Sequence, residues 1–441
     1  MTMIDIIEKK KKGKELTSEE IGFFIDGVTN RLIPDYQISA LLMAIVLKGM
    51  SDDEMTTLTL AMANSGETND LSFIDGIAVD KHSSGGVGDK CTPIVLPLVA
   101  TFGVESVKLS GRGLGITGGT IDKFESIEGF STSIAIEDFP SKIRDCGMVI
   151  SGQTPDLAPA DKVLYALRDV TATVDSIPLI ASSIMSKKIA GGAKAIILDV
   201  KCGSGAFMKT KEDAMKLAQA MMSIGKLAKR DVRCIVSDMD QPLGNNCGNV
   251  LEMQEVHFTL SGSGPEDLVC ISSIIAAHMV DMAGKANGMS FEELVNECKN
   301  RLNNGMALEK YKDLILSQGG CISSTGGPVY VDVPFEVFSI SAPCDGYISR
   351  VDASLIGKAC VTVGSGRLTK EDKIDYGAGV VLRKKIGDRV SRGDTLCSIY
   401  VGRSIEADDE KVDTAASYAL DAYEICDIPV EKGPIIISTL V

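Results

Sequence analysis

The chain has 441 residues, enough for two or three domains, and its 44% hydrophobic content can bury a large core. A formal net charge of −15 disfavours nucleic acid and anionic membrane surfaces as partners, so any phosphate group must be bound in a local pocket. The 12 cysteines form no CxxC pair and show no zinc-ligand spacing, so we expect reduced, packed thiols.

The N-terminal region is charged and predicts helices. It begins MTMIDIIEKKKKGKE, without the apolar run of a signal peptide, and no apolar stretch approaches the ~20 residues that span a bilayer. We therefore expect a cytoplasmic protein. Over residues 1–70, polar capping residues precede apolar positions at helical spacing, and Thr17 followed by Glu20 is a capping box. This pattern predicts the first segment of a small helical domain.

Residues 71–158 alternate short strands, glycine-rich loops and helices. The strand-like stretches GIAVD and ESVKLS lead into the loops KHSSGGVGDK and GRGLGITGGT. A repeat of strand, loop and helix predicts a parallel sheet, with ligands at the C-terminal ends of its strands. Neither loop has the spacing of a Walker A or GxGxxG motif. Two such loops after successive strands can nevertheless converge on one anion, because their backbone N–H groups and hydroxyls bind phosphate.

The α/β pattern is interrupted by a second helical segment over residues 159–192 and resumes over residues 193–333. We expect the two helical segments to pack together as one domain beside a larger α/β domain, with a cleft between them that can close. On the second segment, Tyr165 and Arg168 share one helix face, and so do Ser183 and Lys187, because their spacings are three and four residues.

Residues 334–441 predict a β-rich C-terminal domain that includes the final GPIIISTLV. The stretch KKIGDRVSRGDTLCSI has a sequence pattern similar to that of the hammerhead domain of biotinyl or lipoyl carriers, but the domain lacks the turn with the lysine that is modified in such carriers. The expected fold class is thus α/β plus all-α: a split helical domain, a large α/β domain with a central cleft, and a C-terminal α+β domain.

Four stretches together resemble the family of thymidine and pyrimidine-nucleoside phosphorylases. They are KHSSGGVGDK, SGRGLGITGGTIDKFES, YALRDVTATVDSIPLIASSIMSKKIAGG and DVKCGSGAFMKT, and the similarity extends over essentially the whole chain. The resemblance implies reversible phosphorolysis of a pyrimidine nucleoside, such as uridine, thymidine or 2′-deoxyuridine, to the free base and an α-pentose 1-phosphate. It implies a homodimer, inorganic phosphate as co-substrate and no organic cofactor.

The resemblance also implies roles for individual residues. Phosphate would be bound by Lys81, Ser83, Gly85, Thr92, Lys108, Ser110 and Thr120. The pyrimidine would be bound by His82, Tyr165, Arg168, Ser183 and Lys187, of which His82, Arg168 and Lys187 would be catalytic. Donors that face the charge developing on the departing base lower the barrier. We expect Arg168 and Lys187 to face solvent in an open cleft.

Several family members bind potassium at positions that correspond here to Gly88, Lys90, Leu243, Asn246 and Glu255. The chain departs from the family pattern at Lys90, where a small residue is common. If Lys90 contributes only its carbonyl the ion site survives, whereas an inward ammonium could replace the ion. Ile116 stands where the family has a histidine bordering the base and sugar, and Ser84 replaces a threonine.

Three alternatives remain open at this point. The enzyme could be a thymidine phosphorylase restricted to 2′-deoxynucleosides. A phosphoribosyltransferase of the anthranilate type shares the split plan, but we find no acidic loops for magnesium and diphosphate. A non-enzymatic carrier or binding protein would have to use the C-terminal domain, which lacks the carrier lysine.

Overall fold

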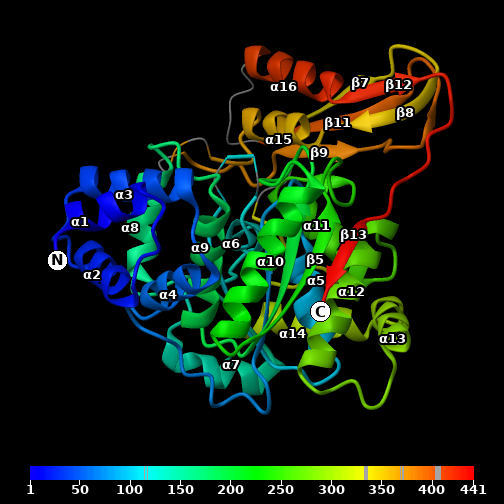
Figure 1. Ribbon diagram of the computed structural model, residues 1–441. Helices are drawn as coiled ribbons and strands as arrows, with labels where there is room; N and C mark the ends of the chain where they lie inside the picture. The colour runs from blue at the N-terminus through cyan, green and yellow to red at the C-terminus, as the bar shows by residue number, and fades with distance from the viewer. Residues whose placement is uncertain (114, 117, 332–335, 368, 370–371, 403–408) are drawn as a thin grey trace.

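The computed structural model describes residues 1–113, 115–116, 118–331, 336–367, 369, 372–402 and 409–441. It contains a group of helices, a central α/β part and a C-terminal β-rich part (Figure 1), which is the expected fold class. The expected boundary between residues 333 and 334 lies outside the described residues.

The helical part is built from two chain segments. It comprises α1 (Met3–Lys11), α2 (Ser18–Thr29), α3 (Asp35–Lys48), α4 (Asp52–Ala63), α8 (Pro159–Arg168) and α9 (Ile177–Ala190). The later helices α8 and α9 pack against α2, α3 and α4. The capping box at Thr17 and Glu20 starts α2. A buried ion pair of 2.8 Å between Lys10 and Glu54 joins α1 to α4.

The central sheet has the strand order β1-β4-β5-β13. Its strands are β1 (Val79–Ser83), β4 (Ala195–Cys202), β5 (Asp231–Asp238) and β13 (Ile436–Leu440). The first three are parallel, and all of β4 is buried, as expected for an apolar central strand covered on both faces. Assigning the final strand to the C-terminal domain was wrong: β13 pairs antiparallel with β5, because the exposed edge of β5 offers it free backbone groups.

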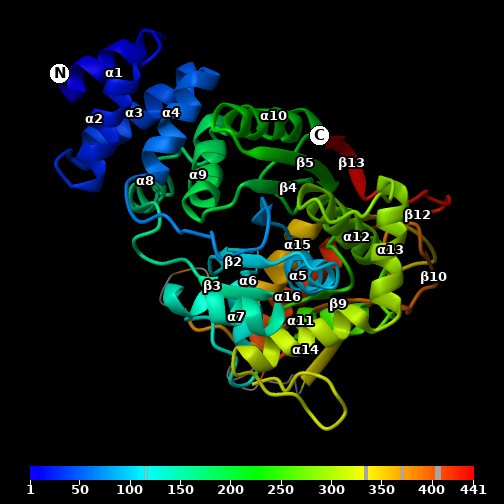
Figure 2. The ribbon, with the colours of Figure 1, turned by 90° about the horizontal axis from the view of Figure 1, so that it is seen from below.

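A parallel pair, β2 (Ser106–Ser110) and β3 (Met148–Gly152), lies beside β1. The helices of this part surround the strands (Figure 2). They are α5 (Cys91–Ala100), α6 (Thr120–Glu125), α7 (Phe139–Cys146), α10 (Lys211–Leu227), α11 (Asn249–Leu260), α12 (Glu266–Met282), α13 (Phe291–Asn303) and α14 (Met306–Ser317), with a 3₁₀ turn at Ile136–Asp138. Helix α5, apolar on all sides, is buried throughout beneath α12 and α14.

The C-terminal part contains two small sheets and two helices. Its elements are β7 (Glu336–Ser341), β8 (Gly346–Val351), α15 (Ala353–Thr362), β9 (Gly379–Leu382), β10 (Arg389–Val390), β11 (Thr395–Val401), α16 (Asp409–Asp421) and β12 (Tyr423–Cys426). A short strand of the α/β part, β6 (Asn246–Cys247), pairs with β9 and joins the two parts. Among the described residues, we find no helix with both the length and the apolar character needed to cross a membrane.

Candidate active site

The loop after β1 turns sharply between the sheet and α5. Gly85 and Gly88 have φ angles of 97° and 71°, which favour glycine. The Gly85 N–H donates to Ser83 Oγ at 3.3 Å. Ser84 fixes the loop to β4: its N–H donates to Asp199 O at 2.9 Å, and its Oγ accepts the Lys201 N–H at 2.8 Å. The backbone is therefore held in shape before any ligand arrives.

This loop and the loop after β2 converge on one cavity of about 180 Å³. The residues that line it include six of the seven predicted phosphate ligands: Ser83, Gly85, Thr92, Lys108, Ser110 and Thr120. The seventh, Lys81, lies just behind, with its buried ammonium 3.4 Å from Thr92 Oγ1. His82 also lines the cavity. The structure thus brings together two loops that are separated in the sequence by α5 and β2.

The cavity is rich in buried ammonium groups. Lys108 donates to Asp80 Oδ1 at 3.2 Å and to the carbonyl of Lys81. Burial, together with the charges of Lys188 and Lys81, lowers the pKa of Lys108 to about 7 despite the opposing charge of Asp80. Near neutral pH Lys108 is therefore only partly protonated, and a bound anion would favour its charged form.

Asp89 supplies negative charge at the same cavity. Burial opposes its ionisation, but the charges of Lys81, Lys201 and Lys123 hold the pKa of Asp89 well below its usual range. Asp89, Cys91 and Asp199 also bring possible metal-ligand atoms within 4.8 Å of one another, yet the Lys201 ammonium already pairs with Asp199 at 2.6 Å. The negative charge of these three side chains is therefore partly balanced by the Lys201 ammonium.

His82 lies near the C-terminal end of β1 and lines the cavity. Burial and then the charges of nearby lysines hold the pKa of His82 well below its usual range; these are Lys188, Lys108, Lys81 and Lys187. At neutral pH its imidazole is therefore uncharged and can donate one ring N–H. This buried, lysine-rich environment favours the neutral imidazole of His82 over the imidazolium.

Three of the predicted pyrimidine ligands form a compact cluster on α8 and α9. The Lys187 ammonium lies 3.3 Å from Ser183 Oγ and 5.7 Å from the centre of the Tyr165 ring. It also forms a 2.8 Å ion pair with the buried carboxylate of Asp161. The Lys187 side chain is 27% exposed. An ammonium, a hydroxyl and an aromatic ring therefore lie together beside a partly exposed side chain.

Arg168 does not face solvent as expected, because it is only 2% exposed. Its guanidinium donates to the backbone carbonyls of Thr173, Val174 and Leu179 at 3.2, 2.7 and 3.2 Å. The carbonyls of Thr173 and Val174 lie in the loop between α8 and α9, and that of Leu179 lies in the first turn of α9. Arg168 therefore holds that loop, while its guanidinium carbon stays 5.8 Å from the Tyr165 ring centre.

Sequence reasoning missed two acidic residues that organise these groups. Asp161 lies four residues before Tyr165, on the same face of α8, so the helical spacing could have identified it. Asp80 is a buried carboxylate in β1, but the strand (VDKHS) also carries a lysine, a histidine and a serine, so its composition gave no comparable signal. The Asp80 oxygens pair with Lys108 at 3.2 Å and with Lys188 at 2.7 Å. Asp80 thus links β1 and β2 to α9, which carries two of the predicted pyrimidine ligands.

The loop after β2 also contacts the C-terminal part. Ile116 packs against the hydrophobic cluster of that part, close to Gly357, and lies outside the lining of the 180 Å³ cavity. Ile116 therefore does not line the cavity that holds the predicted phosphate ligands. Arg367 donates to Asp122 Oδ1 of α6 at 3.0 Å. The C-terminal part thereby supports the second phosphate loop.

The five residues predicted to hold potassium also lie together. The Lys90 ammonium, fully buried, lies 2.7 Å from the carbonyl oxygen of Leu243 and 2.6 Å from Glu255 Oε2. A β-carbon on Gly88 would lie 2.7 Å from Leu243 O and 3.4 Å from Asn246 O. Two of the expected oxygen donors, those of Leu243 and Glu255, are therefore already bound by the Lys90 ammonium.

Comparison with known families matches each part of the chain. Residues 75–308 match the glycosyl transferase family a/b domain, and residues 4–66 match the helical bundle domain of the same family. Residues 347–421 match the pyrimidine nucleoside phosphorylase C-terminal domain.

Curated relatives align over nearly the full length. The chain is 53% identical, over 91% of its length and 93% of the relative's, to a pyrimidine-nucleoside phosphorylase of Staphylococcus haemolyticus. It is 50% identical to that of Bacillus subtilis over 100% of both chains, and 49% identical to that of Geobacillus stearothermophilus over 99% of both.

A solved anthranilate phosphoribosyltransferase from Thermus thermophilus has a similar fold, with a TM-score of 0.55 at 17% identity, over 71% of this chain and 98% of that one. At that identity the likeness concerns the fold alone, and it covers the arrangement of helical and α/β parts. The match of the α/β domain, the match of the C-terminal domain and the near-complete alignments agree, and the chain belongs to the pyrimidine-nucleoside phosphorylase family.

Proposed function

We propose that the chain catalyses reversible phosphorolysis of pyrimidine nucleosides, including uridine, thymidine and 2′-deoxyuridine. The products are the free base and α-D-ribose or 2-deoxyribose 1-phosphate. The observation that carries the proposal is the position of His82, which lines the cationic cavity and whose ionisation also responds to Lys187 of the neighbouring helix cluster. One residue therefore connects an anion site to a site suited to a polar heterocycle.

In this proposal, phosphate binds in the 180 Å³ cavity. Ammonium groups of Lys81 and Lys108 provide charge, and the Gly85 N–H and the hydroxyls of neighbouring residues orient the oxygens; these are Ser83, Thr92, Ser110 and Thr120. A preorganised set of donors aligns the nucleophile without further reorganisation. A phosphate oxygen then forms a bond to the anomeric carbon from the face opposite the base.

The bond between the anomeric carbon and the base nitrogen breaks, and its electron pair passes to the pyrimidine. Lys187 and Ser183 hold the base against Tyr165, and the ammonium stabilises the charge that develops on it. His82 donates its ring N–H to the 2-oxygen of the base as a neutral imidazole. The base takes up a proton on release. The two clusters lie on different parts of the chain, so we propose that closure brings the reactants together.

The test is phosphate-dependent release of uracil from uridine, followed by ultraviolet absorbance, with thymidine and 2′-deoxyuridine measured side by side. We expect turnover of all three substrates and none without phosphate. Turnover of the 2′-deoxynucleosides alone would restrict the enzyme to thymidine phosphorylase activity. Absence of any phosphate-dependent release would contradict an enzymatic function and favour a binding protein.

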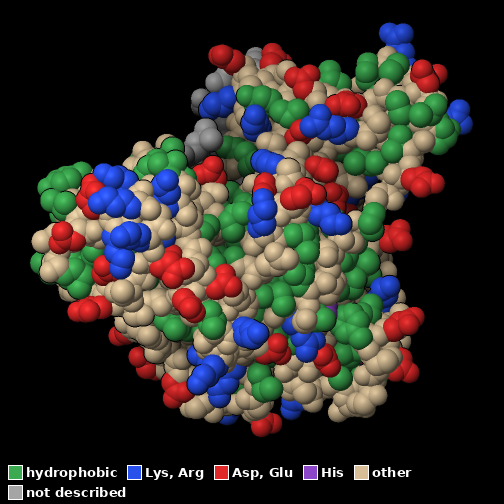
Figure 3. Space-filling view, viewed as in Figure 1, with side chains coloured by type: hydrophobic (Ala, Val, Ile, Leu, Met, Phe, Trp, Pro, Cys, Tyr) green, Lys and Arg blue, Asp and Glu red, His purple; other side chains and the backbone are tan. Residues whose placement is uncertain are grey.

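We further propose that the chain acts in the cytoplasm as a homodimer that associates through its N-terminal helices. Large apolar side chains are exposed there: Leu32, Tyr36 and Leu47 are 77%, 73% and 71% exposed. Figure 3 shows hydrophobic side chains gathered on this end of the molecule. Light scattering should give a dimer mass for the native chain, and a Leu32→Glu/Leu47→Glu variant should be monomeric.

A further inference from the structure

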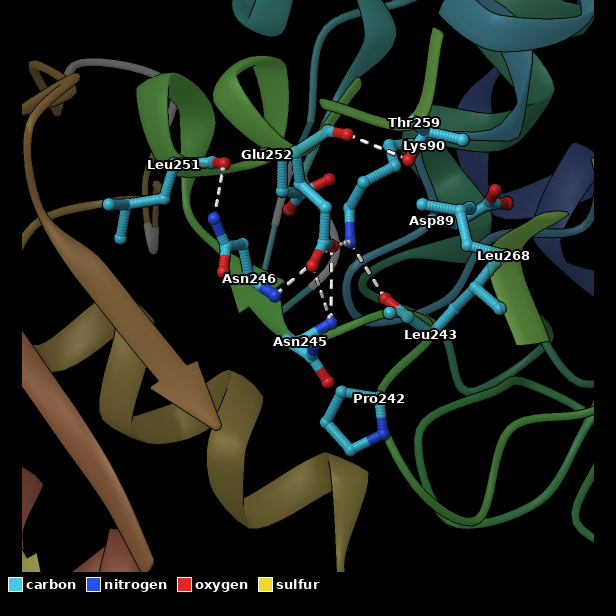
Figure 4. A network of polar contacts seen from close by, with 12 residues as sticks. Asp89, Lys90, Pro242, Leu243, Asn245, Asn246, Leu251, Glu252, Thr259 and Leu268 are labelled. Carbon is cyan, nitrogen blue, oxygen red and sulfur yellow. Dashed lines mark hydrogen bonds and ion pairs between the residues drawn. The ribbon is translucent and has the colours of Figure 1, made fainter. Parts of the chain in front are cut away.

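Lys90 connects three separate pieces of the α/β part. It directly precedes α5, and its side chain crosses to the loop before α11 and to α11 itself (Figure 4). The ammonium donates to the carbonyl of Leu243 at 2.7 Å and to Glu255 Oε2 at 2.6 Å. Because Lys90 is 0% exposed, both contacts are made without competition from water.

The acceptor Glu255 is also held in place by backbone donors. The N–H groups of Asn245 and Asn246 donate to its carboxylate, at distances of 2.9 to 3.2 Å. Three elements thus meet at this carboxylate: the start of α5, the loop of residues 243–246 and α11. A single positive charge at the position of the ammonium balances the carboxylate and orders the surrounding carbonyls.

The residues do not fit a metal cation in addition to this ammonium. A potassium ion held by Leu243 O and Glu255 would need the same oxygens and the same space as the Lys90 Nζ. A second lysine reinforces the positive charge: Lys123 pairs with Glu252 at 2.7 Å, one turn earlier on α11. A potassium ion beside Glu255 would lie next to the Lys90 ammonium, and two cations at one buried carboxylate repel each other strongly.

Lys90 remains charged in this setting. Burial alone would lower its pKa, but the charges of Glu255 and Glu252 outweigh that effect and hold the pKa of Lys90 above its usual range. Because its ammonium pairs with Glu255 at 2.6 Å, Lys90 places a monovalent cation at this position that is covalently part of the chain. Ammonium and potassium carry the same charge, and both are accommodated by carbonyl and carboxylate oxygens.

We infer that the Lys90 ammonium replaces a monovalent metal ion in this chain, and that the folded protein is independent of potassium. This inference goes beyond the proposed reaction, because it concerns what joins the phosphate loop to α11. It can be tested by protein stability without any substrate, so its failure would be distinguishable from failure of the proposed activity.

The experiment compares three proteins by thermal unfolding at constant ionic strength, in potassium chloride, sodium chloride or choline chloride. They are the native chain, Lys90→Ser, which removes the ammonium and leaves room beside the oxygens, and Lys90→Met, which removes the charge but keeps most of the volume. For the native chain we expect the same Tm in all three salts. For Lys90→Ser we expect a lower Tm in choline and a saturable rise of about 2 °C or more in potassium. Lys90→Met should be destabilised without this rescue.

A saturable, potassium-specific increase of Tm in the native chain would overturn the inference. So would equal responses of Lys90→Ser and Lys90→Met to potassium. Crystals soaked with thallium(I), a potassium analogue with strong anomalous scattering, provide a second readout. We expect no thallium between Leu243 and Glu255 in the native protein and a peak there in Lys90→Ser. If neither variant folds, the native Tm series and the native thallium map decide.

Discussion

Lys188 of α9 and Asp80 of β1 form a buried ion pair of 2.7 Å, and this pair joins the helix that carries the pyrimidine cluster to the strand that leads into the phosphate loop. The neighbouring residue, Lys187, belongs to the pyrimidine cluster and pairs with Asp161 of α8. Two consecutive lysines therefore serve two sites. The relative position of the sites depends on a carboxylate that also contacts Lys108.

Lys188→Met should raise the pKa of Lys108, although Lys188 is not one of the predicted substrate ligands. The substitution removes a like charge and leaves Asp80 paired with Lys108 alone, so the pKa of Lys108 should rise above about 7. We also expect a loss of about 3 kcal/mol in the free energy of unfolding, because a buried pair is broken. Chemical denaturation and the pH dependence of anion binding measure the two effects. An unchanged pH profile would contradict this coupling.

Anion affinity should fall as pH rises through the pKa of Lys108, about 7 in the free protein. A bound anion stabilises the ammonium and raises the pKa of Lys108. At a pH above the pKa of the free protein, anion binding must therefore be accompanied by uptake of a proton, and the affinity falls by at most about tenfold per pH unit. Sulfate is the suitable probe, since its own charge stays constant between about pH 6 and pH 9, whereas phosphate titrates in this range.

Lys108→Gln is the matched control for sulfate binding measured by calorimetry. It should bind sulfate more weakly than the native chain at low pH and show a flatter pH dependence. The prediction fails if the native chain and Lys108→Gln have the same pH profile.

Arg168→Ala should lower stability as well as activity. Its guanidinium satisfies three backbone carbonyls around the loop between α8 and α9, and truncation leaves them without these donors. We expect a loss of about 2–4 kcal/mol in the free energy of unfolding. Arg168→Lys should recover only part of it, because an ammonium cannot reproduce the planar array of donors. If Arg168→Ala has the same Tm as the native chain, Arg168 does not stabilise the loop and can act only as a substrate ligand.

Lys187 allows stability and catalysis to be separated. Lys187→Met leaves the buried Asp161 carboxylate without its partner and should cost about 1–3 kcal/mol of stability, less than a fully buried pair because Lys187 is partly exposed. It should also reduce kcat/KM for uridine by about 10²–10³-fold. In Lys187→Met/Asp161→Asn the stability should recover while turnover stays low. Recovery of turnover in the double variant would exclude a direct role for the ammonium.

The sequence was sufficient to predict the features that depend on local patterns. Capping residues and helical spacing indicated the helices, and glycines after two predicted strands indicated loops that meet at one cavity, as they do at Ser83 and Ser110. The pairing of Lys187 with Ser183 on one helix face followed from their four-residue spacing.

Features that depend on long-range contacts could not be predicted in this way. The burial of Arg168 depends on the path of the loop after α8, and the direction of Lys90 depends on Glu255, which is remote in the sequence. The pairing of β13 with β5 likewise depends on which sheet edge is free, and that is decided only when the whole chain has folded. Such contacts leave no periodic signal in the sequence around either partner.

The position of β13 has a consequence for how the protein is made. Its partner β5 ends at Asp238, whereas β13 begins at Ile436, so the entire C-terminal part is inserted between two neighbouring strands of one sheet. During synthesis the ribosome must release that part before the edge of β5 can be covered. The nascent chain therefore carries an uncovered sheet edge through the later stage of translation, when it depends most on protection from aggregation.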